Sequence, residues 1–206
     1  SDEHVRLWSV QLLAQSSADS STIAVALASM AADEPSPLVR LYLASAIQKL
    51  PPSHRWAVAK ALVRYAEDTN DHAQPLMIWY GIEPAVSLNP SKALALADAT
   101  VFPIIRRHVS RLLASDLDKT PEHITQLLNA ASQSKPSTAQ NYLQGIAAAL
   151  RGRRRVESLP EWLPLIQKYQ TTPSNKLSDL ANELLVVFGD GRTVNSLLST
   201  VRDRDA

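Results

Sequence analysis

Apolar residues recur along this chain at spacings of three and four positions, not two. The clearest stripes are Ile124, Leu127, Leu128 and Ala131; Leu143, Ile146, Ala147 and Leu150; and Leu177, Leu180, Ala181, Leu184 and Phe188. This spacing places the apolar side chains on one side of an α-helix, whereas a half-buried strand would alternate. The pattern therefore predicts an all-α protein.

Thirteen prolines divide these stripes from one another, and only five glycines are present. Proline is tolerated in the first turn of a helix, because its missing N–H would have no intrahelical acceptor there. The stripes and prolines together predict about twelve helices with short connections. Their approximate bounds are 3–15, 20–33, 37–50, 53–67, 73–87, 91–98, 100–115, 121–133, 137–151, 160–170, 174–188 and 192–203.

A short sequence repeat accompanies the helical pattern. The segment EHVRLW at 3–8 is matched by PLVRLY at 37–42, and later second helices begin near 73, 100, 137 and 174. Helix pairs repeating at this distance are typical of α-solenoids. The Val-Arg pair after an acidic or proline-containing turn resembles the HEAT repeat family, and the tetratricopeptide signature is missing. We expect an α-α superhelix (a HEAT/armadillo-like solenoid) of about six helix pairs, forming a single HEAT-like repeat domain over residues 1–206.

A wider resemblance rests on three segments: DEHVRLWSVQLL, DEPSPLVRLYLASAIQKLP and EDTNDHAQPLMIWYGIEPAV. Their order resembles the helical-repeat region of large planctomycete-type proteins described as membrane-bound dehydrogenases or haem-binding proteins, most specifically over residues 1–86. The resemblance implies an exported chain with a β-propeller, helical repeats and a cytochrome c-like domain bearing CxxCH. It implies an internal fragment of a larger dehydrogenase-like protein in the periplasm or another extracytoplasmic compartment, and it transfers no catalytic residue.

Composition narrows the possible partners. Lys and Arg number 21 against 20 Asp and Glu, so the net charge of +1 provides no general attraction for nucleic acid or an anionic membrane. No apolar run approaches the roughly 20 residues that span a bilayer. The absence of cysteine excludes disulfides and CxxCH haem attachment within this sequence, and the five histidines form no HxxxH pair. We expect no haem, metal or other cofactor.

The stretch LMIWYGIEPAV at 76–86 is the first candidate site. In a helix, Trp79 and Glu83 are an i,i+4 pair, and Pro84 should bend or end the helix. One interpretation is a packed core in which Glu83 accepts buried hydrogen bonds. The other is a surface where Trp79 and Glu83 contact a partner.

The stretch RGRRR at 151–155 is the second candidate. Its four arginines, Arg151, Arg153, Arg154 and Arg155, could contact an anionic partner through their guanidinium groups. Cations and a glycine are equally suited to the C-terminal end of the preceding helix, because they complement its dipole and unpaired carbonyls. Both interpretations stay open.

The segment DLDKT at 116–120 looks like the DxDxT motif of haloacid-dehalogenase-type phosphatases, whose first aspartate is a nucleophile. That chemistry requires the motif at the end of a parallel strand, whereas here it follows a helical stripe. We expect an inter-helix loop in which Thr120 caps the next helix and Pro121 begins it.

These patterns favour a non-enzymatic helical-repeat scaffold or protein-interaction module, and the family resemblance implies that it belongs to a larger, exported redox-type protein. The expected partners are proteins or adjacent domains of the same chain, with no nucleic acid and no membrane insertion by this sequence. The alternatives are a DNA-glycosylase-type enzyme with HEAT-like helices, which would gather arginines and an aspartate in a groove, and a helical-repeat nucleic-acid binder, which would repeat base-reading side chains.

Overall fold

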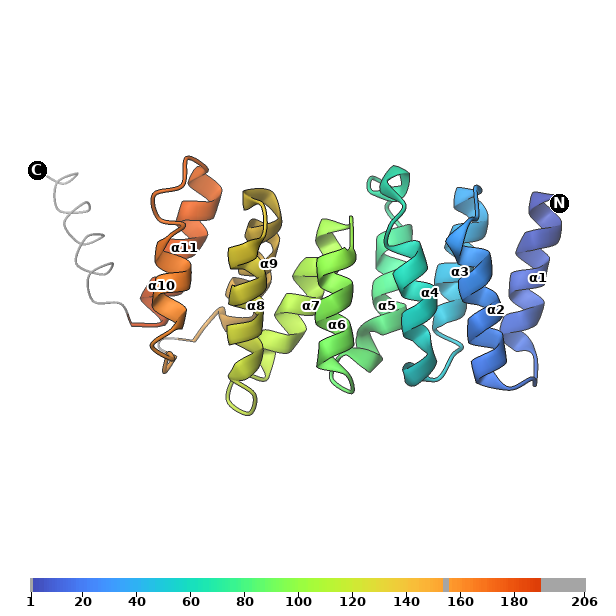
Figure 1. The fold of residues 1–206 in the computed structure, drawn as a ribbon, viewed down its shortest axis with the longest axis horizontal. Coiled ribbons are helices and arrows are strands. Elements are labelled where there is room, and N and C mark those ends of the chain that lie inside the picture. Colours follow the sequence, from blue (N-terminus) through green and yellow to red (C-terminus); the bar gives the residue numbers. More distant parts are fainter. Residues whose placement is uncertain (1, 154–155, 190–206) are drawn as a thin grey trace, which may run out of the picture. The chain divides into compact units, whose positions relative to one another are not determined.

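A computed structural model describes residues 2–153 and 156–189, in which the only regular secondary structure is helical and no strand is present (Figure 1). The α-helices of this part are α1 (Glu3–Gln15), α2 (Ser20–Ala32), α3 (Pro37–Ile47), α4 (Arg55–Leu62), α5 (Gln74–Val86), α6 (Pro90–Ala99), α7 (Pro103–Ser115), α8 (Glu122–Gln133), α9 (Pro136–Leu150), α10 (Trp162–Gln167) and α11 (Asn175–Val187). Two 3₁₀ helices, η1 (Pro52–His54) and η2 (Ala66–Asp68), flank α4. The predicted all-α fold is confirmed, and the helix expected at 192–203 lies outside the described residues.

Side-chain caps and first-turn prolines mark the N-terminal ends of several helices. The carboxylate of Asp2 accepts the His4 and Val5 N–H groups at the start of α1, and the Ser36 hydroxyl accepts from Val39 N–H at the start of α3. These bonds satisfy donors that have no intrahelical acceptor. Prolines occupy the first turn of several helices: Pro37, Pro75, Pro90, Pro103 and Pro136.

The predicted cap before α8 is wrong in detail. Residues 116–120 do form a loop between α7 and α8, but the Thr120 hydroxyl donates to the carbonyl of Asp116 at 3.1 Å. Pro121, and not Thr120, is the N-terminal flanking residue of α8, and it has no side-chain cap.

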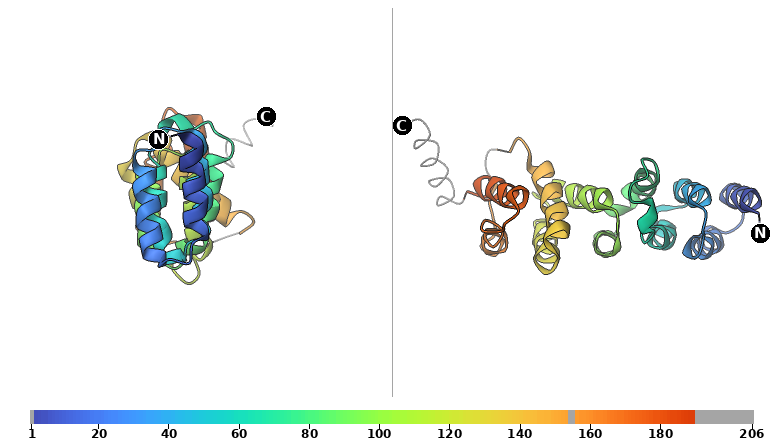
Figure 2. Two further views of the ribbon diagram at one scale, coloured as in Figure 1. Left: turned by 90° about the vertical axis from the view of Figure 1, so that its right-hand side faces the viewer. Right: turned by 90° about the horizontal axis from the view of Figure 1, so that it is seen from above.

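Contacts divide the chain into two compact units, residues 1–109 and 110–206. In the first unit, α1 packs on α3 and α3 on α5, while α2 packs on α4 and α4 on α6. Odd-numbered and even-numbered helices thus form two rows, visible in the blue-to-green part of Figure 2. In the second unit, α9 packs on α11 and α8 on α10, so each unit repeats the same i to i+2 pattern.

Two arginine–carboxylate pairs connect successive helix pairs of the first unit. Arg40 in α3 donates from Nε and Nη2 to the two carboxylate oxygens of Asp68 at 2.7 and 2.6 Å. Arg6, at the same position in α1, donates to both oxygens of Glu34 at 2.8 and 2.7 Å. Each carboxylate follows its arginine by 28 residues, and each bidentate pair joins a helix to the turn before the next odd-numbered helix.

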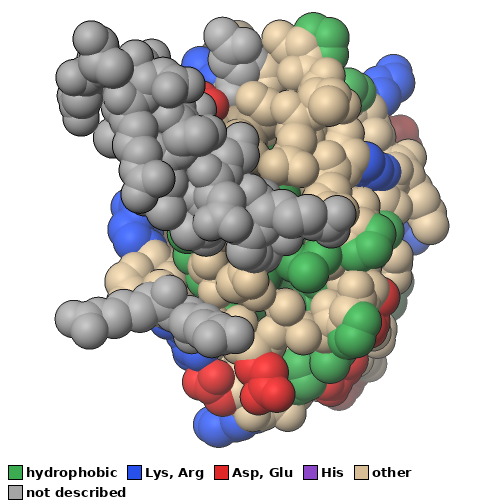
Figure 3. All heavy atoms as spheres, turned by 90° about the vertical axis from the view of Figure 1, so that its left-hand side faces the viewer, with side chains coloured by type: hydrophobic (Ala, Val, Ile, Leu, Met, Phe, Trp, Pro, Cys, Tyr) green, Lys and Arg blue, Asp and Glu red, His purple; other side chains and the backbone are tan. Residues whose placement is uncertain are grey.

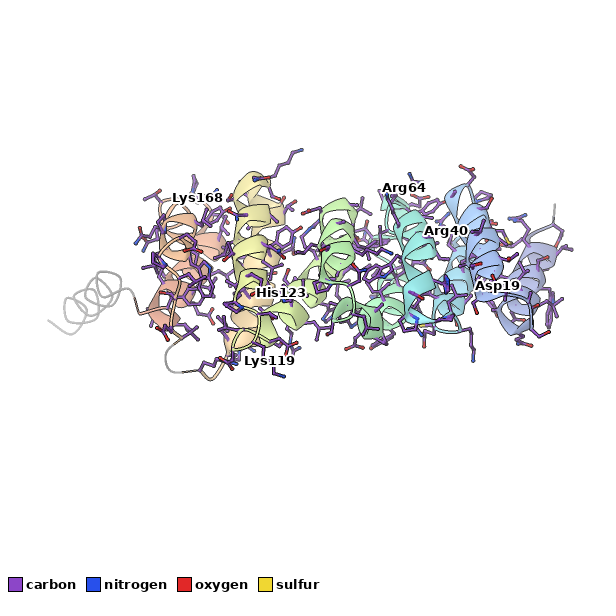
Figure 4. All side chains as sticks on the ribbon, turned by 60° about the horizontal axis from the view of Figure 1, so that its bottom comes forward. Asp19, Arg40, Arg64, Lys119, His123 and Lys168 are labelled. Carbon is purple, nitrogen blue, oxygen red and sulfur yellow. The ribbon has the colours of Figure 1, made fainter. Side chains whose placement is uncertain are left out.

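The Arg40 guanidinium is fully enclosed, with a relative exposure of 1% (Figure 4). Its Nη1 donates to the backbone oxygens of Glu34 and Pro35 at 2.9 and 3.0 Å, and its face lies 4.3 Å from the centre of the Tyr65 ring. The hydrogen bonds to Asp68 raise the pKa of Arg40. A buried charge is tolerated here because its donors are paired.

Glu34 is also held ionised. Burial opposes the charge on Glu34, but the hydrogen bonds from Arg6 and from the Ser36 N–H, with the nearby charge of Arg40, keep its pKa below the ordinary value. The hydrogen bonds to Glu34 raise the pKa of Arg6 in turn. The Arg6–Glu34 pair is therefore charged at neutral pH.

Tyrosine hydroxyls connect the even-numbered helices in a second, independent way. Tyr65, just after α4, donates to the carbonyl of Ala31 in the last turn of α2 at 2.8 Å. Tyr169, just after α10, donates to the carbonyl of Ala131 in the last turn of α8 at 2.7 Å. Carbonyls in the last turn of a helix have no intrahelical donor. The same kind of capping contact is therefore present in each unit.

Tyr169 provides a pH-dependent test of this contact. Burial raises the pKa of Tyr169 to about 12 from an ordinary value of 10.0, so the unfolded chain loses this proton first. The protonated Tyr169 hydroxyl makes its full contribution to the free energy of unfolding below about pH 10. This contribution is lost as the pH rises towards about 12. We expect Tyr169→Phe to lower the free energy of unfolding by about 1 kcal/mol at pH 8. Urea unfolding at pH 8, 10 and 11 should show this difference between the two proteins shrinking, and a constant difference would contradict the assignment.

Candidate functional site

The stretch LMIWYGIEPAV forms most of α5, which continues through Pro84 to Val86. Proline has no N–H to donate to the carbonyl of Tyr80, four residues earlier, and its ring pushes that carbonyl aside. Arg55, which lies after η1, donates from Nη1 to the next carbonyl, that of Gly81, at 2.8 Å. The proline therefore does not end α5, and a guanidinium from the neighbouring helix supports the backbone near the interruption.

Trp79 is a packing residue. Its side chain is 6% exposed and stacks on the His108 ring, with ring centres 5.0 Å apart and planes inclined by 23°. The interpretation of Trp79 as part of a packed core is confirmed. Because so little of its surface is accessible, Trp79 offers almost no area to a partner.

Glu83 does not share this environment, and its predicted role as a buried acceptor is wrong. Glu83 is exposed, as are Tyr80 and Ser87, which lie three residues before it and four after it. These positions form a solvent-facing stripe on the side of α5 away from Ile78 and Ile82. Glu83 is accessible to a partner, and its role as a partner contact stays a prediction.

Gly81 is required by the close approach of α3 and α5. A Cβ at position 81 would lie 2.7 Å from Cγ2 and 2.8 Å from Cβ of Ile47. The second of these atoms cannot move unless the α3 backbone moves. Glycine therefore permits a helix–helix distance that any other residue would increase.

We expect Gly81→Ala to lower the free energy of unfolding by about 1–3 kcal/mol, because the added methyl group overpacks the α3–α5 contact. Gly152→Ala is the control. Gly152 has a φ of 87° with nothing within 4 Å of an added Cβ, so this variant carries only backbone strain of about 1–2 kcal/mol. Guanidinium unfolding of the two variants, each combined with Ile47→Ala, measures the difference. Ile47→Ala should reduce the stability loss caused by Gly81→Ala and leave that caused by Gly152→Ala unchanged. If it does not reduce the loss caused by Gly81→Ala, the steric clash with Ile47 is contradicted.

The first unit also has a groove of about 440 Å³ across α1, α3 and the start of α5. Of the residues that line it, the apolar Val10 and Ala46 are buried, and the polar Gln15, Ser45 and Lys49 are exposed. The lining residues are Val10, Gln11, Ala14, Gln15, Leu41, Tyr42, Ser45, Ala46, Lys49, Ala73 and Met77. Residues from three helices, far apart in the sequence, make this surface. It was not predicted, because no local pattern brings these helices together.

The RGRRR stretch follows α9. Arg151 is exposed, and Arg153 donates from Nη1 and Nη2 to the Asp118 carboxylate at 2.7 and 2.9 Å. Those bonds lower the pKa of Asp118 and raise that of Arg153. Asp118 belongs to the DLDKT loop, so a carboxylate of this candidate motif neutralises the charge of one arginine of the RGRRR stretch. Arg154 and Arg155 lie outside the described residues.

Charges of both signs appear on the described surface of the end view in Figure 3, without a single basic field. In the described part of the chain, intramolecular hydrogen bonds engage the guanidinium groups of Arg6, Arg40, Arg55, Arg106 and Arg153. Among the described residues, no group of three or more His, Asp or Glu side chains is placed to hold a metal ion. No helix in the same ranges is both long and apolar enough to cross a membrane.

The carboxylates that pair with Arg6 and Arg40 were not identified from the sequence. A signal for them was present, because Glu34 and Asp68 are separated by the same offset as the two arginines. Equal offsets for both partners would have indicated a repeated ion pair.

Comparison of the chain with protein families, with curated proteins and with solved structures found no match.

Proposed function

We propose that this chain is a HEAT-like α-α superhelix acting as a non-enzymatic scaffold or protein-interaction module. The observation that carries the proposal is the pair of bidentate contacts Arg6–Glu34 and Arg40–Asp68, which occur at one period and join like positions of successive helix pairs. Contacts that repeat with the sequence period are what stacked repeats produce, since each repeat buries its face against its neighbours.

The surface favours a protein partner over nucleic acid. The groove across α1 and α3 is lined by both apolar and polar residues, as protein interfaces are. A DNA-glycosylase-type enzyme or a nucleic-acid binder needs arginines free to reach phosphates. Here the guanidinium groups of Arg6, Arg40 and Arg55 are engaged in intramolecular hydrogen bonds. Binding of a labelled DNA duplex at physiological salt would favour those alternatives instead.

Deletion of one repeat tests the architecture. Removing residues 35–68 takes out one full period and leaves Glu34 to pair with Arg6. A repeat array should keep its helicity per residue and a cooperative melting transition, because α5 and α6 can stack where α3 and α4 were. The control removes residues 35–51, half a period. If both deletions unfold the chain alike, the repeat architecture is wrong.

The larger setting stays a proposal as well. The resemblance to planctomycete-type dehydrogenase or haem-binding proteins implies that this module belongs to an exported, multi-domain redox protein. The complete reading frame around residues 1–206 tests this directly. A signal peptide upstream and a CxxCH motif downstream are expected, and their absence from a complete frame would remove this part of the proposal.

A further inference from the structure

A second groove of the first unit, of about 440 Å³, is lined by residues of α4 and α6 and is hereafter the α4–α6 groove. Two of its lining residues, Trp56 and Leu96, are buried. The other five are exposed: Ala57, Lys60, Lys92, Ala95 and Ala99. Because α4 packs on α2 as well as on α6, the groove lies within the row of even-numbered helices and not on its first member.

Small side chains leave this groove open. Ala95 and Ala99 are four residues apart in α6, so they lie on one side of that helix, and Ala57 lines the groove from α4. Alanine extends only one methyl group from the backbone, so the space that a longer side chain would fill stays accessible. An apolar side chain of a partner can therefore approach the backbone of both helices.

The α4–α6 groove also carries positive charge. Among the described residues that line it, the charged ones are Lys60 from α4 and Lys92 from α6. No ion pair in the described part of the chain engages either ammonium group. Two lysines from different helices thus flank a surface of alanines, and a partner that brings carboxylates to this surface would complement its charge.

This lining favours a protein helix over other anionic ligands. A small anion is usually held by several polar groups that converge in a concave site, whereas here two flexible side chains flank apolar surface. Single-stranded nucleic acid stacks its bases on accessible aromatic rings, whereas Trp56 is only 8% exposed. An amphipathic helix has an apolar face with charged residues beside it, which matches the alanines and lysines of the groove.

We propose that the α4–α6 groove binds an acidic amphipathic helix of a separate protein. The apolar side chains of that helix lie over Ala57, Ala95 and Ala99. Its carboxylates pair with Lys60 and Lys92. This inference rests on the proposed interaction function and gives the chemistry of one partner for it.

A designed peptide tests the groove. The probe is a fluorescently labelled helix of about 18 residues, with leucine and alanine on one face and glutamate on both flanks of that face. Fluorescence anisotropy should show saturable binding as the protein concentration rises to about 1 mM. The dissociation constant should increase with salt, because exposed charges are screened. The same peptide with lysine in place of glutamate should bind about tenfold more weakly or less.

Charge reversal identifies the residues. Lys60→Glu combined with Lys92→Glu should weaken binding of the acidic peptide by about tenfold or more and strengthen binding of the lysine peptide. The matched control is Lys49→Glu combined with Lys119→Glu, which changes the net charge equally at two exposed lysines outside the α4–α6 groove. The control should leave both affinities within about twofold of the parent. All four positions are exposed, so both proteins should keep the parent's circular dichroism.

Two further measurements separate the apolar contact from the charges. Ala95→Gln places a longer polar side chain in the groove and should weaken the acidic peptide by about threefold or more, whereas Ser29→Gln, at an exposed position of α2, should not. A carbodiimide, which joins a carboxylate to an amine, should link the acidic peptide to Lys60 and Lys92 and leave Lys49 unlinked. Mass spectrometry identifies the linked lysines.

Several results would overturn the proposal. These are no binding of the acidic peptide by the folded chain, equal effects of the two charge reversals, and tighter binding of a DNA duplex or of anionic lipid vesicles through Lys60 and Lys92. The repeat-deletion test reads the folding of a single chain without any peptide. A failure of the repeat architecture and a failure of this groove assignment are therefore distinguishable.

Discussion

Replacing Arg40 with alanine is expected to lower the free energy of unfolding by about 3–5 kcal/mol, because it leaves a buried carboxylate without its partner. Asp68 is 4% exposed, and the substitution removes both of its guanidinium donors. It also removes the donor to the carbonyls of Glu34 and Pro35. Urea unfolding followed by circular dichroism measures the loss.

Two variants serve as references for the Arg40 experiment. Arg64→Ala changes an exposed arginine of the same unit and should leave stability nearly unchanged (Figure 4). Arg40→Met combined with Asp68→Leu removes both charges and should recover much of the loss, because apolar side chains of similar volume can replace a buried ion pair. Equal stability of Arg40→Ala and Arg64→Ala would show that the buried pair contributes nothing.

Replacing Trp79 with alanine is expected to cost about 3–5 kcal/mol, as large-to-small aromatic substitutions in cores do. The variant would remove the indole that packs against His108 and would leave a cavity beside α5. Chemical denaturation gives the free-energy change, and near-ultraviolet circular dichroism reports the lost tryptophan environment. A melting temperature equal to that of the parent would contradict the packing role.

Glu83 provides the contrast within the same helix. Since Glu83 is exposed, Glu83→Gln and Glu83→Ala should each change the free energy of unfolding by no more than about 0.5 kcal/mol. Any effect should appear in partner affinity instead. A clear loss of stability in Glu83→Ala, relieved in Glu83→Gln, would restore the buried-acceptor interpretation that the structure contradicts.

The helices were predictable because their signals are local. The i, i+3, i+4 spacing of apolar residues, the prolines in first turns and the capping residues act within one or two turns of chain. The predicted range 3–15 matches α1, and 20–33 exceeds α2 by one residue. Gly189, with a φ of 78°, follows the C-terminal end of α11, since glycine adopts this conformation without steric cost.

Predictions that depended on which face of a helix is buried were less reliable. Trp79 and Glu83 are neighbours at i,i+4, and the sequence pattern placed both in one environment. The structure separates them, because Trp79 is buried and packs against His108 of α7, whereas Glu83 is exposed. A helix period sets the direction of each side chain, whereas the width of the covered arc depends on the neighbouring helices.

By itself, the sequence determined the helical class, the positions of the helices and the offset between the first two Val-Arg pairs. Only the tertiary structure decided that Arg40 pairs with Asp68, that Gly81 lies against Ile47, and that Arg153 is engaged by Asp118. Helix formation follows from interactions within a few residues of the chain. The two ion pairs join residues 28 and 35 positions apart, and Gly81 meets a residue of another helix, so all three contacts exist only once the helices have packed.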